Sequence, residues 1–199
     1  NREKKRAELS LKSDDIVITC VSKLRRGKGH NYLLEAFEQL RHYSERRQKS
    51  HTNRRFKLLI VGDGEQKEIL LKQIESYKSK SNILFIGNRN DVKELLRISD
   101  IFILPTLGEG MSNALLEAMA SGLPVITTDI PENNELIKNG KTGILVPIKD
   151  SDSLAKAIED LLSDGERRKN LSENSKRNIS EYFDVRIVVS KLTGFLDEL

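Results

Sequence analysis

The sequence predicts an α/β fold, a Rossmann-like open parallel sheet with helices on both faces. Two observations predict it. Short runs of β-branched and apolar residues alternate with amphipathic stretches of helical period, and glycine or proline stands at several junctions between them. Repetition of strand and helix places each helix as a crossover between parallel strands.

Six segments read as buried strands: 16–21, 57–61, 83–86, 101–104, 124–127 and 144–146. Five stretches between or after them carry apolar residues at helical spacing, around Tyr32–Leu40, Ile69–Tyr77, Leu95–Ile98, Leu115–Met119 and Leu154–Leu161. Asp150 or Ser151 can cap the last of these helices. The tail from Glu166 to Leu199 is helical in pattern and shows no strand signal.

Composition favours one domain with a real core. The chain has 199 residues, of which 37% are hydrophobic, and its 32% charged fraction is mixed in sign. The net charge of +4 is weak evidence for a nucleic-acid partner and fits a phosphate ligand or an anionic membrane surface equally well. An ordinary basic surface is the plainer interpretation. A lone cysteine, Cys20, indicates a reducing compartment, and no apolar run approaches the roughly 20 residues that span a bilayer.

A basic segment, residues 41–57, follows one expected helix and precedes a strand. This places it at the amino edge of the sheet, whereas ligands of such sheets bind at the carboxyl edge. We favour a solvated helix end here over membrane contact, and nucleic acid is the least favoured partner.

Residues 108–119 follow the expected strand 101–104 and open a helix. Gly108 and Gly110 would let a ligand approach the backbone, and the first turn of a helix offers unpaired N–H groups and a positive dipole end. The segment therefore predicts a cradle for a diphosphate.

Two acidic residues, Glu109 and Glu117, lie within this segment. If both lay on one helix, eight steps would separate them by about 12 Å along its axis. They could then contact opposite ends of one long ligand, such as a nucleotide sugar. A capping glutamate and an unrelated helix-face glutamate remain the alternative.

The loop after the first strand, residues 22–30, is rich in cations. Lys23 and Lys28 could neutralise a diphosphate at the carboxyl edge, with Arg25 and Arg26 as weaker candidates. A solvated basic loop is the plainer interpretation. His30 could lie near the cleft, although a surface or capping role is the simpler expectation.

In order along the chain, these segments resemble glycosyltransferase family 4, within the GT-B fold. The resemblance covers roughly residues 16–163 and rests on the stretches 28–29, 60–64, 86–92, 99–106, 109–120, 122–126 and 139–146.

The resemblance implies roles by position. Glu109 would contact the donor sugar and Glu117 the ribose hydroxyls, while Lys28 would hold the diphosphate. Arg89 falls where the backbone reads the base. The remaining residues that we expect to bind donor are Gly62, Gly108, Gly110, Met111, Ser112 and Asn113.

Two departures from the family pattern stand out. The family usually has Gly-Arg where this chain has Ser22-Lys23, and lysine keeps the charge but loses the bidentate fork. An aromatic residue often stands where this chain has Met111.

The resemblance begins at the second half of a GT-B enzyme. We therefore expect residues 1–14 to be a linker or the start of the domain, and residues 15–199 to form a nucleotide-sugar-binding domain with C-terminal helices. The N-terminal acceptor domain would be absent, and the isolated domain should bind donor without transferring sugar.

The implied reaction is retaining transfer of a sugar from a UDP- or GDP-sugar to a glycan or lipid-linked acceptor. Charge on the departing diphosphate would be stabilised by Lys23, Lys28 and the helix start, with Glu109 at the sugar. No metal or other cofactor is expected, because no Asp-x-Asp or His cluster suits one. We expect a cytoplasmic protein, with peripheral contact at the inner face of the membrane as a further expectation.

Two alternatives remain. One is a nucleotide-sugar epimerase of similar fold, and the other is a non-catalytic nucleotide-binding module.

Overall fold

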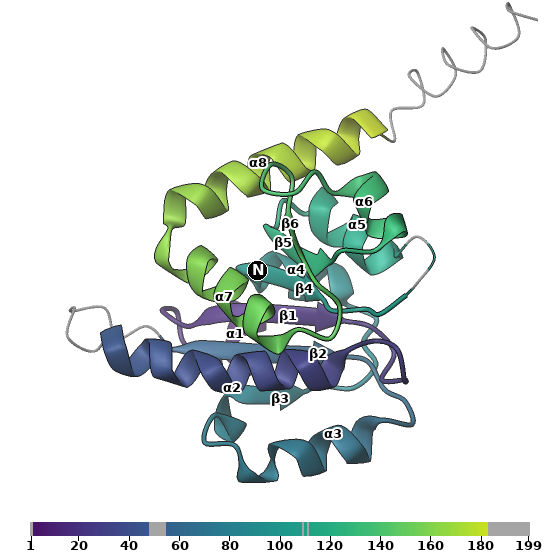
Figure 1. Ribbon diagram of the computed structural model, residues 1–199. Coiled ribbons are helices and arrows are strands. Elements are labelled where there is room, and N and C mark those ends of the chain that lie inside the picture. The colour runs from purple at the N-terminus through teal and green to yellow at the C-terminus, as the bar shows by residue number, and fades with distance from the viewer. Residues whose placement is uncertain (1, 48–54, 109, 111, 183–199) are drawn as a thin grey trace, which may run out of the picture.

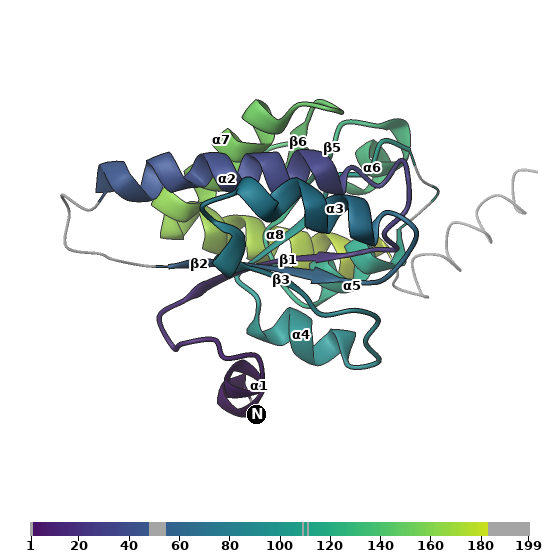
Figure 2. The ribbon, with the colours of Figure 1, turned by 90° about the horizontal axis from the view of Figure 1, so that it is seen from below.

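The computed structural model describes residues 2–47, 55–108, 110 and 112–182, with the side chains of 41–47 left aside. Within these residues the chain forms one parallel sheet between two layers of helices (Figures 1 and 2). The strands are β1 (Ile16–Val21), β2 (Phe56–Val61), β3 (Ile83–Phe85), β4 (Ile101–Leu104), β5 (Val125–Thr128) and β6 (Ile144–Val146). All six expected strands are confirmed, with bounds shifted by one residue at most.

The helices are α1 (Arg2–Glu8), α2 (His30–Arg47), α3 (Lys67–Gln73), α4 (Val92–Ile98), α5 (Asn113–Ala120), α6 (Pro131–Leu136), α7 (Ser151–Ser163) and α8 (Gly165–Tyr182). Two short 3-10 helices, η1 (Ile74–Ser76) and η2 (Lys80–Asn82), lead into β3. Of the two expected caps, Asp150 begins α7 by accepting a hydrogen bond from the Ser153 amide. The expected helical tail is confirmed as far as Tyr182, and its remainder lies outside the described residues.

The strand order is β3-β2-β1-β4-β5-β6, and every described pairing is parallel. From β1 the chain adds β2 and β3 toward one edge of the sheet, and from β4 it adds β5 and β6 toward the other edge. The direction of winding therefore reverses between β1 and β4, and ligands of open α/β sheets bind beyond the carboxyl ends of the strands at such a point.

Both faces of the sheet are buried, which explains why the strands are apolar without alternation. Alternate residues of β1 point to opposite sides. Ile18 joins the core beneath α2 and α7, whereas Val17 joins the core beneath α4. A third cluster packs α5 and the end of α8 against β4 and β5. Figure 2 shows α2, α3 and α7 on one side of the sheet and α4 with α1 on the other.

No helix among the described residues combines the length and the apolar character that crossing a lipid bilayer requires.

Candidate functional site

A pocket of about 600 Å³ opens at the carboxyl edge of the sheet, beside the reversal between β1 and β4. Its walls come from the end of β1 and the loop after it, the end of β2, the loop after β3, and the start of α5. The lining residues are Val21, Ser22, Lys23, Arg25, Lys28, Val61, Gly62, Asn88, Arg89, Val92, Ser112, Asn113 and Ala114. The pocket unites six of the expected site residues, drawn from segments far apart in sequence.

Backbone hydrogen bonds fasten the loop after β1 to the loop after β2. The amide of Leu24 donates to the Asp63 carbonyl at 3.0 Å, and the Leu24 carbonyl accepts from the Gln66 amide at 2.9 Å. The Gly62 amide donates in turn to the Gly87 carbonyl, beyond β3, at 2.8 Å. Three consecutive loops of the carboxyl edge are thus joined into one rigid rim.

Gly62 is required by the backbone at this rim. Its φ is +137°, and a Cβ built there would stand 2.0 Å from the Ser22 carbonyl oxygen. A residue with a side chain could stand this close to the Ser22 carbonyl only if the loop after β1 or the loop after β2 moved. The close contact brings the ends of β1 and β2 together as one wall of the pocket.

The two lysines expected to hold phosphate both line the pocket, in different surroundings. Lys28 is buried, with 3% of its surface exposed, whereas Lys23 is exposed. A phosphate oxygen near Lys28 would interact with it at low local dielectric, where a charge–charge attraction is stronger than in water. Arg25, a weaker candidate from the sequence, lines the same pocket.

His30 is buried, so the expected surface role is wrong. It opens α2, and its Nε2 lies 2.8 Å from the Ser22 hydroxyl. Burial, and to a lesser extent the charge of Lys28, lower the pKa of His30 to about 4. The imidazole is therefore neutral near pH 7 and adds no positive charge beside Lys28.

The start of α5 faces the pocket through Ser112 and Asn113. Ser112 is the N-cap: its side chain accepts a hydrogen bond of 3.4 Å from the Leu115 amide. Because Asn113 is the first helical residue, Glu109 precedes α5 by four positions. The separation expected for two glutamates on one helix therefore does not apply, since the serine cap fixes where the helix begins.

Glu109 and Met111 lie outside the described residues. The flanking Gly108 and Gly110 are exposed and do not line the pocket. Gly108 lies in the loop after β4, where its carbonyl accepts a hydrogen bond of 3.2 Å from the Thr106 hydroxyl.

Glu117 lies on the exposed side of α5 and lines a second pocket, of about 840 Å³, between α4 and α5. The two pockets share Val92 in their walls. Glu117 is therefore a neighbour of the first pocket and not part of its lining.

Arg89 lines the first pocket, but its guanidinium is engaged on the far side. Its Nε and Nη2 donate to the two carboxylate oxygens of Asp91 at 2.8 and 2.7 Å. Nη2 also donates to Glu8 at 2.7 Å. These carboxylates raise the pKa of Arg89 above its already high ordinary value, so the group is always charged and already paired.

Six lining residues were not among the expected site residues, namely Val21, Ser22, Val61, Asn88, Val92 and Ala114. Asn88 and Val92 flank Arg89 in a stretch quoted for the resemblance, and their position after β3 is the signal that could have found them. Within the described residues no three His, Cys, Asp or Glu side chains gather as a metal site would need. That the reaction requires no metal stays a prediction.

The family model of glycosyl transferases group 1 matches residues 1–178. The chain belongs to this family. Its match spans most of the sequence and includes every strand of the sheet. The residues that line the pocket at the winding reversal also lie within the matched range.

Two relatives of known name illustrate the similarity. The N-acetyl-alpha-D-glucosaminyl L-malate synthase of Bacillus anthracis is 35% identical over 135 residues, which cover 68% of this chain and 35% of the relative. The UDP-Gal:alpha-D-GlcNAc-diphosphoundecaprenol alpha-1,3-galactosyltransferase of Escherichia coli is 33% identical over 185 residues, covering 92% of this chain and 46% of the relative. The chain thus spans less than half the length of these two relatives.

Solved structures share the fold. Anabaena HepE, in a complex with UDP-glucose, matches with a TM-score of 0.82 at 24% identity, over 100% of this chain and 52% of HepE. The C-terminal domain of the group 1 family protein LpcC from Francisella tularensis matches with a TM-score of 0.74 at 23% identity, over 90% of this chain and 91% of that domain.

Proposed function

We propose that this chain is the donor-binding domain of a retaining glycosyltransferase of family 4. It would transfer a sugar from a nucleoside diphosphate to a glycan or lipid-linked acceptor held by an N-terminal domain. One observation carries the proposal: Lys23, Lys28 and the start of α5 line the same pocket, at the winding reversal of a parallel sheet.

This arrangement suits a diphosphate. Two lysines bring positive charge to one side of the pocket, and the amino end of α5 adds the positive end of a helix dipole. When the bond between the anomeric carbon and the diphosphate breaks, negative charge grows on the diphosphate. Groups already in place would stabilise that charge with little reorganisation, and this is how electrostatic catalysis lowers a barrier.

The names of relatives support the choice of donor. The galactosyltransferase of Escherichia coli is named for UDP-Gal, and Anabaena HepE was crystallised with UDP-glucose. We therefore expect a uridine donor first and a guanosine donor second, with the reaction in the cytoplasm. Peripheral membrane contact would follow from a lipid-linked acceptor.

The test is a thermal-shift screen of the 199-residue chain with UDP-, GDP- and ADP-sugars, followed by calorimetry of any hit. A ligand at one hundred times its Kd stabilises the folded state by about 2.7 kcal/mol, which is readily measured. Binding of one nucleoside diphosphate sugar supports the proposal. If none binds and inorganic pyrophosphate does not bind either, the pocket is not a donor site.

A further inference from the structure

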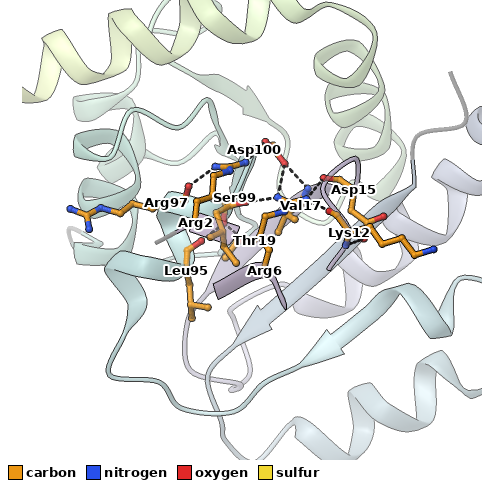
Figure 3. A network of polar contacts seen from close by, with 11 residues as sticks. Arg2, Arg6, Lys12, Asp15, Val17, Thr19, Leu95, Arg97, Ser99 and Asp100 are labelled. Carbon is orange, nitrogen blue, oxygen red and sulfur yellow. Dashed lines mark hydrogen bonds and ion pairs between the residues drawn. The ribbon is translucent and has the colours of Figure 1, made fainter. Parts of the chain in front are cut away.

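Helix α1 is anchored beside α4 by a buried arginine. Arg6 is 5% exposed, and its guanidinium donates to the carbonyls of Ile98, Lys12 and Asp15 at 3.0, 2.7 and 2.6 Å (Figure 3). Ile98 ends α4, and Asp15 directly precedes β1. Because Arg6 satisfies three carbonyl groups around it, α1 is fixed to the carboxyl end of α4.

The same short helix also reaches the amino end of α4, through a closed ring of four charged side chains. Lys5 Nζ donates to Glu8 and to Asp91, both at 2.7 Å. Glu8 accepts from Arg89 at 2.7 Å, and Arg89 completes the ring by its two hydrogen bonds to Asp91. The formal charges of the ring cancel, so it presents no net charge to the pocket beside it.

Asp91 stands at the N-cap position of α4 but makes no side-chain capping bond. Its carboxylate is used instead on Arg89 and Lys5, which hold the pKa of Asp91 well below its ordinary range. An aspartate at this position normally stabilises its own helix. Here it holds the loop before α4 against α1.

That loop forms one end of the donor pocket. Asn88, Arg89 and Val92 line it together with Val61 of β2 and the lysines of the loop after β1, and β2 lies between β3 and β1 in the sheet. If the diphosphate lies at Lys28 and the start of α5, the nucleoside must extend toward one side of that point. On the side of the loop after β3, Val61 and Val92 offer an apolar surface for a flat base, next to the polar Asn88 and the paired Arg89.

We propose that Glu8 is a positioning residue for the nucleoside end of the donor. Through Arg89 it fixes the loop at residues 88–92 against the base. This inference rests on the proposed function and adds to it a role for α1, a helix that does not line the pocket.

The exposure of the four ring side chains sets how much affinity the loss of Glu8 should cost. Side chains in the ring are 18–43% exposed, and single pairs at such exposure contribute little, but a bidentate arginine within a network contributes more. We expect Glu8→Gln to weaken binding of the nucleoside diphosphate by about fivefold. Because Glu8 is partly exposed, the variant should fold as the parent chain does.

The experiment compares two ligands by calorimetry on the 199-residue chain: the nucleoside diphosphate that the parent chain binds, and inorganic pyrophosphate. Glu8→Gln should raise the Kd of the nucleoside diphosphate and leave the Kd of pyrophosphate unchanged. Glu94→Gln is the matched control, because it removes the same charge from an exposed site in the first turn of α4. It should change neither Kd.

An unchanged ratio of the two Kd values in Glu8→Gln overturns the proposal, whether both constants move together or neither moves. A double-mutant cycle gives an independent measurement. Arg89→Gln should cause a similar loss, and adding Glu8→Gln to it should cost little more, because the two residues act through one contact. Fully additive losses contradict the proposal. If the parent chain binds no nucleoside diphosphate, the proposed function itself fails.

Discussion

The backbone amide of Leu107 donates a hydrogen bond of 2.7 Å to the carbonyl of Gly27. It joins the loop after β4 to the loop after β1, the two loops that flank the winding reversal of the sheet. Gly29 packs against the same loop, next to Pro105. The cations of one loop and the helix start of the other are thereby held around one pocket.

Gly29→Ala should therefore destabilise the fold and displace both loops. The φ of Gly29 is +68°, and an added Cβ would stand 1.9 Å from the Pro105 carbonyl oxygen. Left-handed strain together with overpacking should cost about 2–4 kcal/mol in the free energy of unfolding, measured by urea denaturation. Gly27→Ala is the control: its φ is +84° but nothing lies near an added Cβ, so strain alone should cost about 1 kcal/mol. Equal losses in the two variants would contradict the packing argument.

Lys28→Met should weaken nucleoside diphosphate binding severely. The substitution keeps most of the length and apolar stem of the buried side chain while removing its charge. Loss of one charge-assisted contact to phosphate should cost about 2 kcal/mol, or roughly 30-fold in Kd by calorimetry. Lys156→Met, at an exposed position of α7 outside the pocket, should leave the Kd unchanged. Unaltered affinity in Lys28→Met would remove this lysine from the site.

Glu117→Gln tests whether this glutamate accepts a hydrogen bond from the ribose hydroxyls. If it does, the parent chain should prefer a ribonucleoside diphosphate over its 2′-deoxy form, and the variant should lose that preference. A lost hydrogen bond to a charged group is worth about 1.5–3 kcal/mol, an upper limit here because Glu117 is exposed. Competition binding with the two nucleotides measures the preference. Equal affinities in the parent chain would show that Glu117 belongs only to the neighbouring pocket.

His30 should make stability depend on pH in a definite direction. Its pKa is lowered from 6.5 to about 4 in the folded chain, so between these values the unfolded state binds more protons. Stability must then rise with pH across this window and fall as pH drops from 6.5 toward 4. The full difference for 2.5 units is about 3 kcal/mol at most.

Urea denaturation at pH 4.5 and 7 measures this dependence. In His30→Gln, which retains a nitrogen near the Ser22 hydroxyl, the difference between the two pH values should shrink by up to that amount. The acidic residues of the chain are common to both proteins and cancel in the comparison. An identical pH dependence in the two proteins would show that the His30 pKa is not lowered.

The six strands, six of the eight described helices and the edge at which ligand chemistry gathers were predictable from the sequence, whereas α1 and α6 were not expected. Runs of β-branched residues such as those of β1 and β2 must be buried on both faces, and helical periodicity between strands imposes parallel crossovers. Lys23 and Lys28 lie in the loop after β1, and Ser112 lies in the loop after β4. Their presence at one edge was therefore predictable, because the carboxyl ends of parallel strands meet there.

Which side chains contact one another near that edge depends on the tertiary structure. Glu8 and Arg89 are 81 positions apart, and the Ser22–His30 contact depends on how α2 enters from its loop. Neither contact leaves a periodic signal, because a hydrogen bond between side chains depends on distances set by packing of whole helices on the sheet. The start of α5 at Asn113 follows instead from local geometry, the Ser112 cap, which the spacing of the two glutamates does not encode.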